Sequence, residues 1–284
     1  MVKCDIPGWP LAYYEVRAGN VVEVPLQKHL VLTSRIALKV FGKRIKVLDY
    51  MVSSSGLYSY IESVRGVVEA TALLHDIGKA SKFYCGGVKQ GKVSFELHEY
   101  IPAVLLADLS LETNMEEKPV FKLVARAISR HHTSMRSRHP ASLHESKKVE
   151  KLAKALKAFL DDSEEVNNML SALEKLCSTG ESCSFIVGGL KDHISRIDSG
   201  RIVDRVKSGD LFKTLKSTTD SSEDFTGYKI LAGLTGMLIV ADNIAASCEG
   251  RVSDDTHTPS YVTYWLRELN LSGGRLDRIC QDPF

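Results

Sequence analysis

The sequence lacks the features that mark several common classes of protein. Its longest apolar run, residues 230–241, covers about a dozen positions, whereas a helix that spans a bilayer needs roughly 20, so we expect a buried core helix there. Residues 1–10 do not show the basic-then-apolar pattern of a secretory signal. No Gly-x-x-x-x-Gly-Lys-Ser/Thr segment is present, which excludes a P-loop ATPase. These absences predict a cytoplasmic protein that makes no membrane contact.

An excess of charge of one sign is also lacking. The 284 residues include 37 Lys and Arg against 35 Asp and Glu, which gives a net charge of +2 at pH 7. Any binding of nucleic acid must therefore come from a local patch rather than from the overall charge. The hydrophobic content of 44% and the charged content of 25% are those of an ordinary soluble globular protein with a substantial core.

Closely spaced cysteine pairs are missing as well. The chain has neither a Cys-x-x-Cys redox motif nor a pair of the zinc-ribbon kind. Its six cysteines are Cys4, Cys85, Cys177, Cys183, Cys248 and Cys280. We expect free thiols in a reducing cytosol. The alternative is a small loop closed by Cys177 and Cys183, because intracellular disulfides occur in hyperthermophiles.

Helical periodicity dominates what is present. It predicts long helices over residues 26–41, 58–75, 97–109, 120–129, 147–160, 164–176 and 225–247. Shorter helices are predicted over residues 185–190, 192–206 and 259–269, and a polar linker over 217–224. Residues 12–17 and 21–24 form a predicted hairpin, and the glycine-rich residues 82–95 form a second. The pattern therefore predicts an α-helical domain with two small β-hairpins.

One helix ends in a chemically distinctive motif. Residues 72–79 read Ala-Leu-Leu-His-Asp-Ile-Gly-Lys after the apolar run 67–74. Gly78 fits a helix C-terminal cap, because glycine adopts the left-handed conformation without a side-chain penalty. We therefore expect His75 and Asp76 at the buried end of this helix. Imidazole and carboxylate both bind divalent metals, and the two oxygens of an aspartate can bridge two ions.

Further histidines and one acid occupy comparable positions. His29, His98 and the adjacent pair His131 and His132 lie in or at the end of predicted helices rather than in polar tails. Asp242 follows the longest apolar run, where a carboxylate is costly to bury unless it is paired or bound to a metal. A single histidine on an amphipathic helix is usually a core residue. The prediction of a metal site therefore rests on the whole set of residues and their order.

That order resembles the HD superfamily of metal-dependent phosphohydrolases. An isolated His, a His-Asp-Ile-Gly-Lys motif, a lone His, a His-His pair and a late Ala-Asp-Asn-Ile-Ala-Ala-Ser segment are together most similar to the stand-alone HD nuclease of type I CRISPR systems. The resemblance covers residues 26–247. It implies an all-α HD-domain helical bundle with small β-hairpin excursions. We expect one HD-type domain over residues 1–284, with a core at 26–250 and a C-terminal helical extension at 251–284.

The resemblance also implies a ligand set. One metal ion would be bound by His29, His75, Asp76 and Asp242, and a second by His98, His131 and His132, with Asp76 bridging both. Imidazole ligands favour a transition metal such as Mn, Fe, Co or Ni over Mg, which remains the alternative.

Other residues are expected to act on the substrate. Asp76 and Lys79 are the predicted catalytic residues, with Lys79 contacting the scissile phosphate; alternatively, Lys79 is a solvated lysine at a helix end. Arg130, Arg136, Arg138 and Ser247 are candidate contacts to nucleic-acid phosphates. Alternatively, the arginines belong to a solvated charged face, and Ser247 is a serine at a helix end without a ligand. Few aromatic residues interrupt the basic cluster formed by residues 130–139 with Lys147 and Lys148, which favours backbone contacts without sequence preference.

The predicted function is that of a metal-dependent nuclease. The resemblance implies hydrolysis of single-stranded DNA, or of RNA, through a water activated by two metal ions. Its expected partners are a separate CRISPR helicase and a surveillance complex. Two alternatives are a phosphohydrolase for nucleotides or cyclic nucleotides and an inactive regulatory HD domain.

Overall fold

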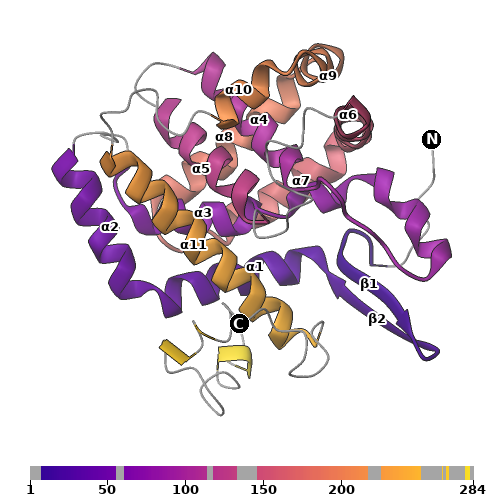
Figure 1. Cartoon of the computed structure of the whole chain (residues 1–284), viewed down its shortest axis with the longest axis horizontal. Coiled ribbons are helices and arrows are strands. Elements are labelled where there is room, and N and C mark those ends of the chain that lie inside the picture. The colour runs from indigo at the N-terminus through magenta and orange to yellow at the C-terminus, as the bar shows by residue number, and fades with distance from the viewer. Residues whose placement is uncertain are drawn as a thin grey trace.

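The computed structural model describes residues 8–55, 61–113, 118–132, 146–216 and 225–250, together with 264, 267–268 and 279–281. Helices make up most of this part of the chain (Figure 1). The elements are β1 (Leu11–Arg17), β2 (Asn20–Pro25), α1 (Leu26–Val40), α2 (Gly42–Ser55), α3 (Val64–Leu74), η1 (Ile77–Ala80), η2 (Lys82–Gln90), α4 (Tyr100–Glu112), α5 (Lys118–Arg130), α6 (Ser146–Leu160), α7 (Ser163–Lys175), α8 (Glu181–Arg196), α9 (Ser199–Ser208), α10 (Asp210–Lys216) and α11 (Phe225–Cys248). The predicted all-α bundle with a small β-hairpin is confirmed.

Two helices form the centre of the bundle. Every residue of α3 except Arg65 is buried, and α3 packs against α1, α2, α5, α8 and α11. The stretch of α4 from Tyr100 to Ser110 is also buried throughout, against α5, α8 and α10. A helix that is apolar on all sides is stable only inside a protein. The His-Asp motif lies on the segment that connects these two buried helices.

Helix α11 is long and apolar enough, from Thr226 to Cys248, to cross a membrane by length and composition alone. In this structure it packs against α1, α2, α3 and α5, and more than half of its most apolar window is buried. It is a core helix of the bundle, as residues 230–241 predicted.

The first predicted hairpin is confirmed. Strands β1 and β2 pair antiparallel, and Ala18 and Gly19 form the turn with φ of 49° and 84°. Two consecutive positive φ values match the right-handed twist of the flanking strands.

The second predicted hairpin is wrong. Residues 82–90 form the 3₁₀ helix η2, which packs on α6, and Gly91 ends it in the left-handed conformation. The chain then pairs with β1, because the Val16 amide donates to Gly91 O at 2.8 Å and the Val93 amide donates to Tyr14 O at 3.3 Å. The glycine-rich segment was expected to form backbone hydrogen bonds within itself. It forms them with the open edge of β1 instead.

Several predicted boundaries also differ. Residues 185–190 belong to the longer helix α8, and the break before α9 falls at Asp198, which caps α9 by accepting from the amides of Gly200 and Arg201. Helices α2 and α10 were not predicted. The linker at 217–224 and most of the helix at 259–269 lie outside the described residues. The single-domain boundaries remain a prediction.

The expectation of free thiols is wrong. Cys177 pairs with Cys183, as the alternative proposed, and Cys248 pairs with Cys280 across 32 positions, a spacing that gives no local signal. Cys85 is disulfide-bonded too. Disulfides persist in oxidising compartments and in hyperthermophile cells, so the cytoplasmic location remains a prediction.

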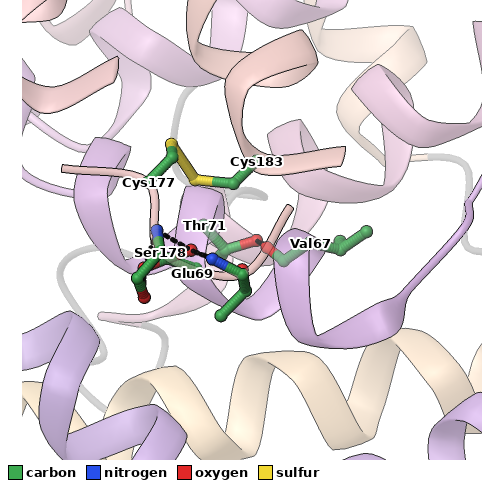
Figure 2. Close-up of a disulfide and its surroundings, with 7 residues drawn as sticks. Val67, Glu69, Thr71, Cys177, Ser178 and Cys183 are labelled. Atoms are coloured by element: carbon green, nitrogen blue, oxygen red, sulfur yellow. Dashed lines mark hydrogen bonds between the residues drawn. A yellow bond between two sulfur atoms is a disulfide. The ribbon is translucent and has the colours of Figure 1, made fainter. Parts of the chain in front are cut away.

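The first disulfide closes a loop that is anchored on α3. Figure 2 shows the bond beside Glu69, a side chain of α3 that is 2% exposed. The amides of Ser178 and Thr179 each donate to this carboxylate at 3.0 Å, and both hydroxyls donate to it as well. These bonds replace the water that the carboxylate loses on burial. The α7–α8 connection is therefore tied to the helix that carries the His-Asp motif.

Replacing this buried carboxylate should destabilise the fold. In Glu69→Gln an amide NH₂ faces backbone donors, so we expect a loss of about 1–3 kcal/mol in the free energy of unfolding. Urea denaturation measures it. The control is Glu165→Gln, an exposed acid on α7 whose loss should cost no more than about 0.5 kcal/mol. Equal effects of the two changes would contradict the anchoring role.

Candidate metal centre

The His-Asp motif lies at a turn between α3 and η1. His75 follows the last residue of α3 with helical φ and ψ, and Asp76 leaves that conformation at φ −110° and ψ 5°. Gly78 does not adopt a positive φ, so the predicted reason for this glycine is wrong. A Cβ at Gly78 would lie 2.1 Å from the carbonyl oxygen of His98. The glycine is required because η1 approaches the His98 turn closely.

The other candidate ligands come from four different segments. His29 lies in the first turn of α1, His131 and His132 follow the last residue of α5, and Asp242 lies within α11. His98 was expected inside a helix but precedes α4, which begins at Tyr100. The residue before it, Leu97, has a φ of 69°, which reverses the chain direction there. Pro102 was the missed signal, since proline is favoured in the first turn of a helix.

The structure brings the first predicted ligand set together. Ligand atoms of His29, His75, Asp76 and Asp242 all lie within 4.8 Å of one another. Asp76 Oδ2 lies 3.4 Å from His29 Nε2 and 3.5 Å from His75 Nε2. Asp242 Oδ1 lies 3.1 Å from His29 Nε2 and 3.7 Å from His75 Nε2.

The second set uses the other oxygen of the same aspartate. Asp76, His98, His131 and His132 also have ligand atoms within 4.8 Å of one another. Asp76 Oδ1 lies 2.7 Å from His98 Nε2 and 3.4 Å from His131 Nε2. The ring of His132 lies 3.9 Å from that of His131, between centroids. Each Asp76 oxygen therefore faces one set, which is the arrangement that a bridging carboxylate needs.

The imidazole rings are held by backbone groups on their outer side. The Nδ1 atoms of three rings each contact the carbonyl three residues earlier: His75 on Ala72 at 2.8 Å, His131 on Ile128 at 2.6 Å, and His98 on Phe95. Because a carbonyl only accepts, Nδ1 carries the proton in each of these rings. The Nε2 atoms therefore point into the centre, which is the orientation that metal-binding histidines require.

Several inward nitrogens lack a hydrogen-bond partner. Within the described part of the chain, Nε2 of His75, His131 and His132 is buried and makes no hydrogen bond. An unsatisfied buried nitrogen costs about 1–3 kcal/mol, and three in one place indicate a missing ligand. The donor set of imidazoles and carboxylates fits a divalent transition metal.

The electrostatics of the centre suit metal binding. Burial lowers the pKa of His75 and His98, and it lowers the pKa of His132 well below its usual value, so these rings are neutral at pH 7. Burial raises the pKa of Asp76, but the nearby His75 and Lys79 outweigh it, so the pKa lies well below its ordinary value. Most ligands therefore already have the protonation state that metal coordination needs.

His131 and Asp242 complete this balance. Burial lowers the pKa of His131, but the Asp76 carboxylate outweighs burial and leaves that pKa raised. Burial raises the pKa of Asp242, but its contacts with His29 and His75 hold it well below the ordinary range.

Lys79 is not a solvated helix-end lysine. It is 7% exposed, and its Nζ lies 2.5 Å from Asp76 Oδ2 and donates to Ala12 O at 3.2 Å. Its ammonium therefore balances the charge of the bridging carboxylate. The predicted contact between Lys79 and a scissile phosphate stays a prediction.

The remaining candidates are placed in part. Arg130 is the last residue of α5 and is half-buried, and burial lowers its pKa. Ser247 is half-buried on α11, five residues after Asp242. Arg136 and Arg138 lie outside the described residues. The predicted phosphate contacts of all four stay untested.

Two acidic residues of the centre were missed. Glu249 Oε2 lies 3.1 Å from His29 Nδ1, and Glu99 Oε2 lies 3.4 Å from His98 Nδ1. A signal existed for Glu249, which follows Asp242 by seven residues, about two helical turns, and directly follows the last residue of α11.

A further cluster of possible ligands is better explained as a charge network. Asp108, Glu112 and His193 lie close together, but the guanidinium of Arg205 donates to Asp108 and that of Arg201 donates to Glu112 at 2.6 Å. Two carboxylates and two guanidinium groups already cancel, so a divalent ion would add unbalanced charge.

The comparison with protein families fits a buried His-Asp centre that could hold a metal ion. The HD-domain family model matches residues 27–164. This match, over just under half of the chain, supports membership of the HD superfamily and points to a metal-dependent hydrolase. The match contains every predicted ligand except Asp242. No curated protein and no solved structure matches the chain.

The close approach of Gly78 to His98 should not tolerate a methyl group. We expect Gly78→Ala to cost about 1–3 kcal/mol of stability, as overpacking does, and to weaken metal binding because His98 moves. Thermal unfolding with and without Mn²⁺ measures both effects. The control is Gly236→Ala, because a Cβ at this position in α11 has nothing within 4 Å. A Gly78→Ala protein as stable as the control would contradict the packing argument.

The two ligand sets should be separable by mutation. Protein reconstituted with Mn²⁺ and desalted should hold two ions, Asp242→Ala and His132→Ala should each hold fewer, and Asp76→Ala should hold the least because both sets share it. Elemental analysis measures the metal content, and circular dichroism checks the fold. The control is His193→Ala, a buried histidine outside the centre. An Asp76→Ala protein that retains both ions would rule out the bridging role.

Proposed function

We propose that this protein is a nuclease that hydrolyses phosphodiester bonds in single-stranded DNA, with RNA as the second candidate substrate. We further propose a role in CRISPR-mediated defence in the cytoplasm, beside a separate helicase and a surveillance complex. The HD domain provides the coarser class, a metal-dependent phosphohydrolase.

The observation that carries the proposal is the division of Asp76 between two ligand sets. Oδ2 faces His29 and His75, and Oδ1 faces His98 and His131. Divalent ions held by these residues would polarise a phosphodiester and lower the pKa of a water molecule. Such chemistry needs no side-chain nucleophile, and it suits an unreactive phosphodiester bond.

The protein residues contribute positioning and charge. The backbone carbonyls behind His75, His98 and His131 fix the direction of each ring before any ligand arrives. The Lys79 ammonium lies against Asp76, which keeps the carboxylate ionised in a buried site. A rigid set of this kind loses little free energy to reorganisation when the substrate binds.

The exposure of the ligands indicates the side from which a substrate enters. Side chains of His29, His75, Asp76, His98 and His131 are at most 2% exposed, whereas that of Asp242 is 14% exposed and His132 is half-buried. A phosphodiester would therefore approach past Asp242 and His132. Arg130 precedes the His-His pair, which makes it the nearest candidate in sequence for a phosphate contact on this side.

The similarity to CRISPR nucleases supports the nuclease over a nucleotide hydrolase. It rests on the His-His pair and on the Ala-Asp-Asn-Ile-Ala-Ala-Ser segment from Ala241 to Ser247, which extends beyond the matched HD domain. In this structure the segment is the part of α11 that delivers Asp242 to the centre.

Cleavage of labelled circular and linear single-stranded DNA tests the proposal. Protein stripped of metal should be inactive, addition of Mn²⁺ or Ni²⁺ should restore cutting of the circle, and Mg²⁺ should restore less because the ligands are mostly imidazole. Asp76→Ala should lose the activity and His193→Ala should keep it.

Two other outcomes would replace the proposal. Hydrolysis of nucleotides or cyclic nucleotides without cutting of either DNA or RNA would make the protein a small-molecule phosphohydrolase. Bound metal without any turnover would make it a regulatory HD domain.

A further inference from the structure

A basic groove lies on the outward side of α1, away from the core of the bundle. It encloses about 600 Å³ between α1, the first turn of α3 and residues 279–281. Lysines and arginines line it together with aliphatic side chains of α1 and residues 279–281. No sequence motif pointed to this groove, and it is separate from the ligands of the metal centre.

Four cations are among the described residues that line the groove. Lys28, Arg35 and Lys39 follow one another at intervals of seven and four residues, so they lie along one stripe of α1, and Arg65 adds a fourth cation from α3. All four are exposed, and no acidic residue is among the described residues of the lining. In a protein of net charge +2 this is a local concentration of positive charge. It would attract a polyanion.

The apolar part of the lining limits what that polyanion contacts. Leu32, Ile36, Leu38 and Ile279 provide aliphatic surface, and no aromatic side chain is among the described lining residues. Bases bind to single-strand sites mainly by stacking on aromatic rings. The groove therefore suits phosphates rather than bases.

The groove and the metal centre both use the start of helix α1. Lys28 immediately precedes the ligand His29, and α1 packs against α3. His29 at the start of α1 lies near His75 at the end of α3, so the two helices run in opposite directions. Arg65, at the start of α3, consequently lies toward Lys39, which is about 16 Å along α1 from Lys28 at 1.5 Å per residue.

The wall of the groove is also connected to the centre. Residues 279–281 are held by the disulfide between Cys280 and Cys248 at the end of α11. The next residue, Glu249, contacts His29 Nδ1 at 3.1 Å. The last residue of α11 is thus bonded to a groove wall, and the residue after it contacts a candidate metal ligand.

We propose that this groove binds the phosphate backbone of the single-stranded substrate and leads it along α1 toward the metal centre. The inference rests on the proposed nuclease function and adds the surface that holds the strand outside the centre. Lys28, Arg35, Lys39 and Arg65 contact successive phosphates without reading the sequence.

The test compares two double variants with equal loss of charge. Lys28→Gln with Arg65→Gln removes a cation at each end of the groove, and Lys157→Gln with Lys213→Gln removes two exposed lysines from α6 and α10. Fluorescence anisotropy follows binding of a labelled phosphorothioate strand, which keeps the charge and resists cleavage, to Mn²⁺-loaded full-length protein across a salt series.

The groove variant should bind more weakly, and the slope of log affinity against log salt should fall by about 1.4, since each phosphate contact on a single strand contributes about 0.7. The control variant should match the wild type in affinity and slope. Strands of different base composition should bind the wild type equally.

A small phosphodiester separates this inference from the proposed function. Hydrolysis of bis(p-nitrophenyl) phosphate should be equal in all three proteins, because neither pair of changes touches a metal ligand. If the groove variant binds the strand as the wild type does, the groove assignment is overturned while DNA cleavage still supports the nuclease. If the wild type hydrolyses the small ester but binds no strand, both the groove and the nuclease are overturned.

Discussion

The burial of one carboxylate, that of Asp76, determines the arrangement of the molecule around it. This side chain is 1% exposed, and an ionised carboxylate in such a place costs several kcal/mol unless charged or polar groups surround it. The compensating groups come from distant parts of the chain: Lys79 directly, and imidazoles from α1, α3, the turn before α4 and the end of α5. The packing of these helices therefore has to place their ends within a few ångströms of one point.

Helix α3 is held both at its C-terminal end and at its middle. Its C-terminal end presents His75 and Asp76, and one and a half turns earlier Glu69 fixes the α7–α8 loop, which the Cys177–Cys183 disulfide closes. A central helix held in this way moves little, so the two oxygens of Asp76 keep their different directions. That separation is what allows one aspartate to serve two ligand sets.

The candidate metal ligands could be predicted from the sequence. The features that depend on contacts between distant segments could not. The order of the His and Asp residues resembles that of the HD superfamily, and this resemblance implied both sets, including Asp242 beyond the matched domain. The role of Gly78 depends on the carbonyl of His98, twenty residues away, and no local pattern reports that approach. The hairpin predicted for the glycine-rich segment before His98 does not form for a related reason: the backbone of this segment forms hydrogen bonds with the edge of β1. The Cys248–Cys280 disulfide likewise joins residues whose proximity only the fold decides.

The central claim is that Asp76 is shared by two metal ions, and anomalous diffraction from crystals of the Mn²⁺-loaded protein tests it most directly. The account predicts two anomalous peaks about 3.5–4 Å apart, one beside Oδ2 with His29, His75 and Asp242, and one beside Oδ1 with His98, His131 and His132. A single peak, or a second peak that does not contact Asp76, would contradict it.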